Sequence, residues 1–271
     1  MYGDLVSVIM PTHNSSKFLA ASVESILGQT YQHLELLITD DCSTDSTHEM
    51  LKSFADKDSR VHVEYLTKQS GPAEARNRSI ERAQGRYIAF CDSDDRWFPE
   101  KLEKQIQHMD KHDCALCSTS YLICDEEGEI IGINYSPSYL TLKEMKRDNK
   151  IGCSTAIYDT KRLGHKYYMP AIRKRQDWAL FLNILKDCQI SYCLKEPLVY
   201  YLHRKGSVSS DKLTLVKYNV NVYETVFSYS KLKSWIFFLF LFLPTYFSKR
   251  LRVKSDSRRY LKQIEKTAMQ L

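Results

Sequence analysis

Short apolar runs alternate with amphipathic segments along the first 112 residues of the chain. Residues 5–10 form a β-branched run that predicts a strand, and residues 18–27 carry apolar side chains at helical spacing. The alternation recurs three times, with strands predicted at 34–39, 61–66 and 87–91 and a helix after each, the last from Pro99 to about residue 111. The polar loop at 12–16 predicts a helix N-cap. Four such pairs predict a doubly wound, mostly parallel α/β sheet with helices on both faces.

The pattern changes after residue 112. Residues 115–124 and 129–134 flank a turn and predict a hairpin, and the later strands are predicted at 154–159, 190–194 and 198–203. A chain of 271 residues can bury a full core. We therefore expect one domain with a parallel half at 1–112 and a mixed half at 113–210, followed by a helical region at 211–271.

A strongly apolar stretch marks the C-terminal region. Residues 235–247 are almost all aromatic or aliphatic, but about thirteen residues fall short of the roughly twenty that span a bilayer. Basic residues flank the stretch on both sides: Lys231, Lys233, Lys249, Arg250, Arg252 and Lys254. This pattern predicts that residues 231–254 associate with an anionic membrane surface. A buried core helix is the alternative.

The net charge of +6 is concentrated in the same region. Residues 231–271 carry ten Lys or Arg and two acidic residues, so the rest of the chain is slightly acidic. A basic tail can bind nucleic acid or an anionic membrane. Its apolar centre favours the membrane, and we expect no nucleic-acid partner.

Eight cysteines raise the question of disulfides or zinc. Most lie in apolar, strand-like runs, no secretory signal precedes them, and a chain of this size does not need covalent cross-links. We expect reduced thiols in a cytoplasmic protein. Cys114 and Cys117 form a lone CxxC pair without a second pair at zinc spacing, so no structural zinc is expected.

Two acidic clusters lie directly after predicted strands. Residues 92–95 hold three carboxylates after the fourth strand, and Asp40 and Asp41 follow the second strand. In an open α/β sheet both strand ends face one crevice. Three carboxylates in four positions repel one another, and a hard divalent cation commonly neutralises such crowding. A solvated turn at 92–95 and a turn-capping pair at 40–41 are the alternatives.

Four segments together carry a family resemblance. They are 7–14, SVIMPTHN; 40–45, DDCSTD; 75–77, ARN; and 85–95, GRYIAFCDSDD. In this order and at this spacing they resemble family 2 glycosyltransferases of the GT-A fold, over roughly residues 5–205. The resemblance implies a nucleotide-sugar-binding half at 1–112, an acceptor-binding half at 113–210, and an enzyme of the bacterial surface-polysaccharide type.

The resemblance places the nucleotide at the first two strand ends. It implies that four consecutive residues belong to the nucleobase edge: Pro11, Thr12, His13 and Asn14. It also implies a hydrogen bond between the base and Asp41, with Asp40 in support. A carboxylate can accept a hydrogen bond from the imide N–H of uracil, which favours a UDP-sugar donor. Arg76 matches a basic residue near the nucleotide, and a solvated arginine on a helix is the alternative.

The same resemblance assigns the second acidic cluster to a DxD metal site. It implies that Asp94 binds the metal, that Asp92 lies near the ribose and the metal, and that Asp95 lies close to the sugar, with Ser93 among them. Mg²⁺ or Mn²⁺ would take its other ligands from diphosphate oxygens and water, so metal affinity is expected to be weak without nucleotide. His203 is a further candidate for the metal or the diphosphate, or else a structural residue.

Residues 173–178, RKRQDW, resemble the acidic motif of the family, in which Glu and Asp precede an aromatic residue. The resemblance assigns Asp177 as the catalytic base, which takes a proton from the acceptor hydroxyl as it attacks the anomeric carbon and inverts its configuration. Gln176 replaces the Glu, so the base is a single carboxylate. Asp177 is also a candidate N-cap of the next helix. Trp97 and Trp178 either stack on sugars or pack in the core.

The expected function follows from these assignments. We expect a metal-dependent, inverting glycosyltransferase that moves a hexose from a UDP-sugar to a sugar hydroxyl on a polyprenyl diphosphate carrier. The basic, aromatic tail would hold the active site beside such a lipid, at the inner face of the bacterial plasma membrane. The pathway would be O-antigen, capsule or exopolysaccharide synthesis.

Three other classes of protein remain as alternatives. A receiver-type, Mg²⁺-binding signalling module would leave the cluster at 92–95 and residues 115–205 without a role. A nucleotidyltransferase would favour a Gly-rich phosphate loop, and residues 11–16 contain no glycine. A catalytically inactive membrane adaptor would not need Asp41, Asp94 and Asp177.

Overall fold

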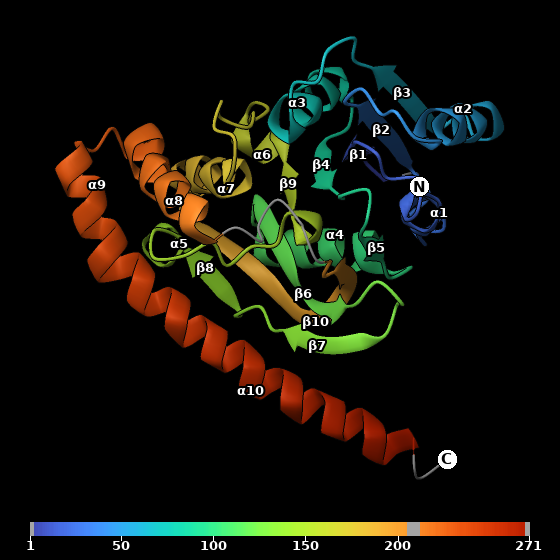
Figure 1. Cartoon of the computed structure of the whole chain (residues 1–271). Coiled ribbons are helices and arrows are strands. Elements are labelled where there is room, and N and C mark those ends of the chain that lie inside the picture. The colour runs from blue at the N-terminus through green and yellow to red at the C-terminus, as the bar shows by residue number, and fades with distance from the viewer. Residues whose placement is uncertain (1–2, 205–211, 269–271) are drawn as a thin grey trace.

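The computed structural model describes residues 3–204 and 212–268. Within these residues ten strands form one sheet, in the order β3-β2-β1-β4-β9-β6-β10-β5, with β7 paired to β6 and β8 paired to β10. The long C-terminal helix α10 runs along the outside of the molecule, as Figure 1 shows. The region boundary expected at 210–211 lies outside the described residues.

The first four strands are parallel, as predicted. Their bounds are β1 Val6–Thr12, β2 Leu34–Asp40, β3 Val61–Tyr65 and β4 Tyr87–Phe90, and the helices between them are α1 Leu19–Leu27, α2 Thr47–Lys57 and α3 Pro72–Arg82. β1 pairs with β2 on one side and with β4 on the other. The strand order therefore reverses between β1 and β4, which is where ligands bind in sheets of this type.

Apolar residues at alternate positions of β1 hold the strand from both faces. Val8 and Met10 belong to the core cluster that contains Val23 of α1, whereas Ile9 belongs to the cluster that contains Ile80 of α3. All five side chains are fully buried. Each buried side chain of this size contributes about 1.5–3 kcal/mol. This packing fixes the position of β1 and therefore of the start of the loop that follows it.

The helix N-cap predicted in the loop after β1 is wrong. α1 begins at Leu19, and Phe18 occupies the N-cap position without a side-chain hydrogen bond. Ser15 in the loop binds elsewhere: its Oγ lies 2.8 Å from Ser93 Oγ, and its N–H donates to Thr47 Oγ1 over 2.9 Å. Contacts between neighbouring loops have replaced a contact within the helix.

The second half of the sheet is mixed, as predicted. Its strands are β5 Arg96–Trp97, β6 Leu116–Cys124, β7 Ile130–Asn134, β8 Tyr139–Thr141, β9 Ile157–Asp159 and β10 Ile190–Leu202, and its helices are α4 Lys101–His112, α5 Leu142–Met145, α6 Thr160–Leu163 and α7 Gln176–Cys188. β6 and β7 form the predicted hairpin. β9 is antiparallel to β4 and β6, while β10 is parallel to β6.

Two predicted strand regions differ in detail. The strand predicted at 154–159 begins with a 3₁₀ turn, Cys153–Thr155, before β9. The strands predicted at 190–194 and 198–203 are one strand, β10, whose register shifts on both sides of Pro197. Because proline has no N–H to give to the sheet, the pairing is interrupted there although the strand continues.

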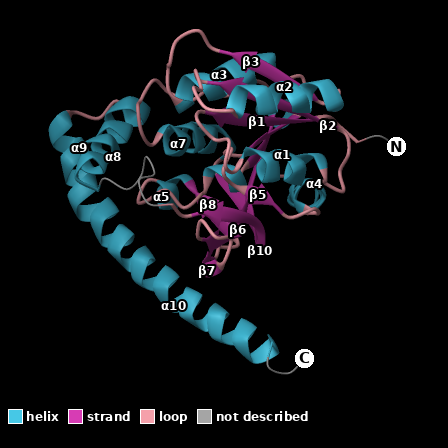
Figure 2. Cartoon of the chain, turned by 45° about the vertical axis from the view of Figure 1, so that its right-hand side comes forward, coloured by secondary structure: helices cyan, strands magenta, loops and turns pink. Residues whose placement is uncertain are grey.

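Helices form the C-terminal region. They are α8 Lys212–Phe227, α9 Lys231–Phe237, a π-helical turn Phe238–Phe242 and α10 Leu243–Ala268. The π-helical turn ends just before Pro244, which cannot donate a helical hydrogen bond. Beyond it, α10 lies beside β7, where Ile133 N donates to Ser257 Oγ over 3.0 Å. Figure 2 shows α8 and α9 packed together at the end of the molecule from which α10 starts.

The apolar segment at 235–247 has two different faces. Phe238 and Phe242 are buried, and the ring of Phe242 lies 5.4 Å from that of Trp178 in the core. Phe240, in contrast, is 72% exposed, and Leu251 farther along α10 is 71% exposed. The buried-helix alternative therefore holds for one face of the segment, while the other face is open to its surroundings.

Among the described residues, no single helix is both long and apolar enough to cross a membrane. The helices at 215–227 and 231–267 satisfy the length and composition limits only when taken together, as a pair bent by 117°.

Candidate active site

A cavity of about 1270 Å³ opens where β1, β2 and β4 end. Most residues predicted for the site line it: Pro11, Thr12, His13, Asp41, Arg76, Asp92, Ser93, Asp94, Asp95 and Asp177. Asn14, Asp40 and His203 are not among its lining residues. Typical small-ligand pockets have about 300–1,000 Å³. This cavity is larger, which leaves space for more than one small ligand.

Asp41 is fixed at one end of the cavity by backbone donors. Its carboxylate accepts hydrogen bonds from Ser70 N over 2.6 Å and from Gly71 N over 2.8 Å. Gly71 has φ +89°, a left-handed conformation that favours glycine. On the other side, Asp41 N donates to Thr12 O over 2.9 Å, and His13 Nδ1 lies 2.7 Å from Asp41 O. The loops after β1 and β2 are thus locked to each other around this carboxylate.

Asp40 and Asn14 close loops beside the cavity. Asp40 is buried, and its carboxylate accepts a hydrogen bond from Ser43 Oγ. Asn14 Oδ1 accepts from Thr44 N over 2.8 Å. The turn-capping alternative therefore describes Asp40. Its neighbour Asp41 has different surroundings, because its carboxylate faces the cavity.

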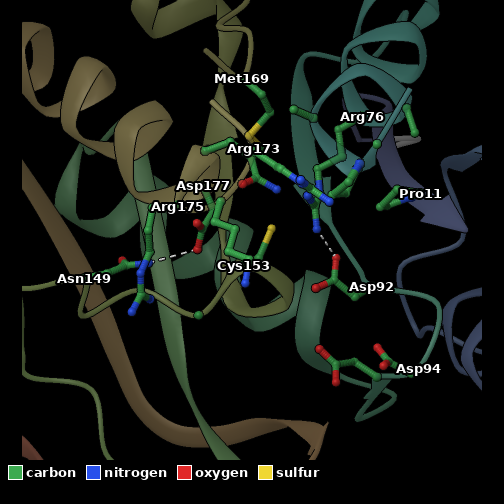
Figure 3. Close-up of a pocket in the computed structure, with 18 of the residues that line it drawn as sticks. Pro11, Arg76, Asp92, Asp94, Asn149, Cys153, Met169, Arg173, Arg175 and Asp177 are labelled. Atoms are coloured by element: carbon green, nitrogen blue, oxygen red, sulfur yellow. Dashed lines mark hydrogen bonds and ion pairs between the residues drawn. The ribbon is translucent and has the colours of Figure 1, made fainter. Parts of the chain in front are cut away.

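Two arginines hold the acidic loop after β4. Arg76 Nη2 lies 2.5 Å from Asp92 Oδ1, and Arg204 Nη2 lies 2.8 Å from Asp94 Oδ2. Arg76 is buried, and its Nε and Nη1 have no hydrogen-bond partner among the described residues. Figure 3 shows Arg76 and Arg173 reaching into the cavity from two sides. Unsatisfied guanidinium nitrogens of this kind favour an anionic ligand.

Asp95 is the buried member of the acidic loop. Its carboxylate accepts hydrogen bonds from Ser154 Oγ and, over 2.9 Å, from Leu202 N, while Ser154 Oγ also accepts from Asp92 N over 3.0 Å. Burial raises the pKa of Asp95 well above its usual range, and the neighbouring carboxylate of Asp94 adds to this effect. Asp95 ties the loop to β10, and the 3₁₀ turn at 153–155 supports it.

The outer carboxylates of the loop suit a hard divalent cation. Burial raises the pKa of Asp94, and the charge of Asp92 raises it further, so a positive ion there would relieve the repulsion. Asp92 and Asp94 offer oxygen donors, which Mg²⁺ and Mn²⁺ prefer. The described residues contain no group of three or more His, Cys, Asp or Glu suited to a metal. His203 is exposed and lies away from the cavity lining. Further ligands would therefore have to come from a bound phosphate or water.

Asp177 faces the same cavity from α7. Figure 3 shows its carboxylate across the open space from Asp92 and Asp94. Asn149 Nδ2 donates to Asp177 Oδ2 over 2.9 Å. The predicted N-cap role of Asp177 is wrong, because α7 begins at Gln176 and Arg175 takes the cap position with φ +69°. Asp177 sits in the first helical turn, where the helix dipole favours a carboxylate.

A sequence model of Glycosyl transferase family 2 matches residues 7–164, which is more than half of the chain. The chain belongs to glycosyltransferase family 2. Membership of this family makes the chain an enzyme, and the receiver-module and nucleotidyltransferase alternatives are excluded.

Relatives of the glycosyltransferase match it along most of their length. It is 40% identical over 223 residues to TuaG of Bacillus subtilis, named as a teichuronic acid biosynthesis glycosyltransferase, with 82% of this chain and 88% of TuaG covered. It is 36% identical over 219 residues to WfgD of Escherichia coli, a UDP-Glc:α-D-GlcNAc-diphosphoundecaprenol β-1,3-glucosyltransferase, with 79% and 83% covered.

Solved structures share the fold of the glycosyltransferase. Staphylococcus aureus TarS residues 1–349, in complex with UDP-GlcNAc, superposes with a TM-score of 0.67 at 22% identity, covering 84% of this chain and 69% of TarS. A mannosyltransferase from Pyrobaculum calidifontis, in complex with GDP-Man and Mn²⁺, gives 0.59 at 15% identity, with 85% and 66% covered. With the strand order, these likenesses confirm the predicted GT-A fold.

The tryptophans of the glycosyltransferase pack in the core. Trp97 and Trp178 are almost fully buried, and their indole N–H groups donate to Ser154 O over 2.9 Å and to Met145 O over 2.7 Å. Neither of them lines the cavity. Of the two predicted roles, the structure supports packing.

Three contributors to the site were not predicted. Asn149 contacts Asp177, Lys249 of α10 donates to Asn149 O, and Ser154 joins Asp92 to Asp95. None belongs to a motif, and Lys249 lies a hundred positions from Asn149. Only the sheet topology brings them to the cavity. Asn77 of the ARN motif has a similar supporting role, since its side-chain amide bonds to both backbone groups of Met169 at 2.7 and 2.9 Å.

Proposed function

We propose that this glycosyltransferase transfers a hexose from a UDP-sugar, with inversion, to a sugar hydroxyl on a polyprenyl diphosphate carrier. One observation carries the proposal: the acidic pair Asp92 and Asp94 and the carboxylate of Asp177 face one cavity from different sides (Figure 3). The names of WfgD and WfaP, both glucosyltransferases that use UDP-Glc and a diphosphoundecaprenol acceptor, support the substrate classes. Glucose and galactose are the first sugars to test.

The residues around Asp41 would bind the uridine. The backbone donors of Ser70 and Gly71 hold the Asp41 carboxylate in place, and each of its oxygens keeps a free lone pair. A fixed acceptor of this kind suits the imide N–H of uracil. Arg76 lies between this end and the acidic loop, and its unpaired nitrogens would contact the nucleotide.

The acidic loop would hold Mn²⁺ or Mg²⁺ together with the diphosphate. A bound ion of this type stabilises the charge that develops on the departing nucleoside diphosphate, so no protein acid is required. Asp92 and Asp94 are the residues that would bind it. Arg204, now paired with Asp94, would then be free to contact phosphate oxygens.

Asp177 would act as the general base. Its carboxylate takes the proton of the acceptor hydroxyl while the hydroxyl oxygen bonds to the anomeric carbon. The bond from that carbon to the diphosphate breaks, and its electron pair leaves with UDP. Attack from the face opposite the nucleotide inverts the configuration. Asn149 orients the base, because its amide donates to one carboxylate oxygen and leaves the other for the acceptor.

The exposed face formed by α9, the π-helical turn and α10 would place the enzyme on the inner face of the bacterial plasma membrane. Large apolar side chains are exposed along it: Leu232, Trp235, Ile236, Leu239, Phe240, Phe247 and Leu251. Basic residues flank them in the sequence, a combination typical of helices that lie in an anionic membrane surface. Such a position would suit O-antigen, capsule or exopolysaccharide synthesis on a lipid carrier.

A substrate screen tests the proposal. The purified protein is incubated with four UDP-hexoses (glucose, galactose and their N-acetylated 2-amino forms), Mn²⁺ or Mg²⁺, and a synthetic GlcNAc diphosphate lipid. We expect release of UDP and a product one hexose heavier, with one preferred sugar and no activity in EDTA. Transfer from none of these donors, or an equal rate in EDTA, would refute it.

A further inference from the structure

A group of basic side chains lies on the side of the cavity that the acidic loop does not reach. Lys150 and Lys249 both line the cavity. Lys150 directly follows Asn149, whose amide donates to the catalytic carboxylate of Asp177. Arg252 lies close enough to influence Lys150 electrostatically, together with Lys249. Lys150 is therefore adjacent in sequence to Asn149, the residue that positions the base.

Lys150 is a cation without an ion-pair partner in the part of the chain that the structure describes. It is half-buried, and among the described residues it has no hydrogen bond or ion pair. Burial lowers the pKa of Lys150, and the charges of Arg252 and Lys249 lower it further against the opposing effect of Glu144 and Asp148. A partly desolvated ammonium group of this kind is stabilised by an anionic ligand.

The two acidic neighbours of Lys150 are already engaged. Asp148 is buried and pairs with Lys249, with 2.9 Å between Oδ2 and Nζ. Glu144 is part of a capping box, in which its carboxylate accepts from Thr141 N over 2.9 Å. Neither carboxylate is left for Lys150 in the described part of the chain, so an anion that completes the site would come from a ligand.

This site is separate from the one expected for the nucleotide. The acidic loop follows β4, Arg76 lies in α3 and Arg204 follows β10. Lys150, in contrast, precedes the 3₁₀ turn Cys153–Thr155, and Lys249 belongs to α10. Figure 3 shows Asn149 and Asp177 together on one side of the cavity, with Asp92 and Asp94 on another. An anion bound at Lys150 would lie beyond the base, on the acceptor side.

We propose that Lys150, with Lys249 and Arg252 beside it, binds the diphosphate of a saccharyl diphosphate lipid acceptor. The inference rests on the proposed function, which supplies an acceptor whose sugar is attached directly to a diphosphate. The three parts of the acceptor would then lie along three neighbouring features of the protein. The sugar hydroxyl would lie at Asp177, the diphosphate at Lys150, and the lipid along the exposed apolar side chains of α10. Lysine ammonium groups are common ligands of phosphate oxygens.

Binding of a matched pair of probes tests the inference. One probe is GlcNAc joined through an α-diphosphate to a short phenylalkyl chain, and the other is the same sugar joined directly to the chain. Each is titrated calorimetrically into the full-length protein with UDP and Mn²⁺ present. We expect Lys150→Gln and Arg252→Gln each to weaken binding of the diphosphate probe, Lys150→Gln by about tenfold, and to leave the direct glycoside unchanged. Lys262→Gln, which changes an exposed cation farther along α10, should bind both probes as the wild type does.

Three results would overturn the inference: unchanged binding of the diphosphate probe by Lys150→Gln, equal weakening of both probes, or equal loss in Lys262→Gln. A parallel transfer assay separates this failure from failure of the proposed function. Sugar transfer by the wild type with unchanged probe binding in Lys150→Gln would remove the subsite alone. Binding of the diphosphate probe through Lys150 without transfer of any sugar would support the subsite and remove the proposed reaction.

Discussion

The aspartates of the cavity differ in their neighbours, and these neighbours decide what each can do. Asp41 is held by two backbone N–H groups, so it is a fixed acceptor. Asp95 is buried between Ser154 and Leu202 and is structural in its contacts. Asp94 remains open enough to exchange its arginine for another cation. A shared residue type therefore serves separate tasks within one site.

We predict that Asp94→Ala loses metal-dependent binding of the UDP-sugar. The substitution removes one of the two outer carboxylates, so kcat/KM should fall at least about 100-fold. Calorimetric titration of UDP-sugar with and without Mn²⁺ measures the effect on binding. Thermal unfolding serves as the control and should show no loss of stability, because the variant also relieves repulsion within the loop. Wild-type donor affinity in Mn²⁺ would argue against a metal at Asp94.

Asp177→Asn should separate binding from chemistry. The amide keeps the size of the side chain but cannot take a proton, so we predict normal UDP-sugar affinity and a transfer rate reduced by about 10²–10⁴-fold. Single-turnover assays with saturating donor measure the rate. Asn149→Ala is the companion variant and should reduce the rate less, since it removes only the orienting hydrogen bond. Transfer at the wild-type rate by Asp177→Asn would exclude this residue as the base.

A further prediction concerns Lys101, a lysine buried outside the cavity. Its Nζ donates to Gln105 Oε1 over 2.7 Å and lies 3.8 Å from the centre of the Trp97 ring. Burial lowers the pKa of Lys101 to about 7, from the ordinary 10.5. Between these values the unfolded chain binds more protons than the folded one, so the free energy of unfolding rises with pH.

We predict that Lys101→Met removes this rise. One ionisable group contributes at most about 1.4 kcal/mol per pH unit. Urea unfolding at pH 7.5 and pH 9 measures the difference for the wild type and the variant. The stability of the wild type should increase more between the two pH values, and an identical increase in the two proteins would contradict the effect of burial.

At the scale of single residues, the sequence predicted the motif positions but not their supports. Asp41, Arg76, Asp92 and Asp94 follow strands or begin a helix, so pattern and resemblance together located them. Asn149 lies in an irregular segment whose sequence has no period. It contacts Asp177 of α7 and Lys249 of α10, and local sequence does not encode contacts with such distant segments.

At the scale of elements, the backbone before β4 passes so close to β1 that only glycine fits at position 85. Gly85 precedes β4, and its N–H donates to Ser7 Oγ over 2.8 Å. A Cβ atom at this position would lie 2.6 Å from Leu5 O and 2.7 Å from Ser7 N, both of which are backbone atoms. The glycine therefore allows β4 to enter the sheet beside β1.

We predict that Gly85→Ala lowers the free energy of unfolding by about 1–3 kcal/mol, because the strands must separate to accept the methyl group. Urea denaturation measures the change. Gln84→Ala is the control, since this exposed neighbour keeps its backbone hydrogen bond to Glu35 and should change stability by less than about 0.5 kcal/mol. Equal stability of Gly85→Ala and wild type would show that the backbone beside Leu5 and Ser7 accepts a methyl group without cost.

The sequence predicted the bounds of the four parallel strands well, but it divided β10 into two strands. The four parallel strands agree with their predicted bounds within two residues, because each is a short run rich in apolar and β-branched residues that ends at polar or turn-forming residues. β10 was predicted as two strands because Pro197 interrupts its pattern, yet pairing with β6 continues on both sides of the proline. Tertiary pairing has overridden a local break.

At the scale of the whole molecule, the C-terminal segment joins the core to an exposed surface. The sequence offered two alternatives for residues 231–254, and the structure puts Phe242 in the core while Phe240 remains exposed. The sequence could not distinguish the buried from the exposed residues, because the run is apolar at almost every position. Which side chains face the core depends on the helical phase, which the π-helical turn sets. Truncation of the tail would therefore damage the fold together with any membrane contact.

Paired substitutions test the two faces separately. We predict that Phe240→Ser reduces binding to anionic phospholipid vesicles and changes the free energy of unfolding by less than about 0.5 kcal/mol. Phe242→Ala should lower that free energy by about 3–5 kcal/mol through the cavity it creates. Vesicle sedimentation and urea denaturation provide the two readouts. Unchanged vesicle binding by Phe240→Ser would refute a membrane role for the exposed face.

The configuration of the product shows whether the acceptor attacks from the side of Asp177, opposite the nucleotide. With Mn²⁺, a UDP-α-hexose and a GlcNAc diphosphate lipid, a metal-held nucleotide sugar opposite the base Asp177 predicts a β-linked product. Proton NMR of the new anomeric centre distinguishes the two configurations. A β linkage formed by the wild type and lost in Asp177→Asn is the result we predict, and an α-linked product would contradict an inverting mechanism with Asp177 as the base.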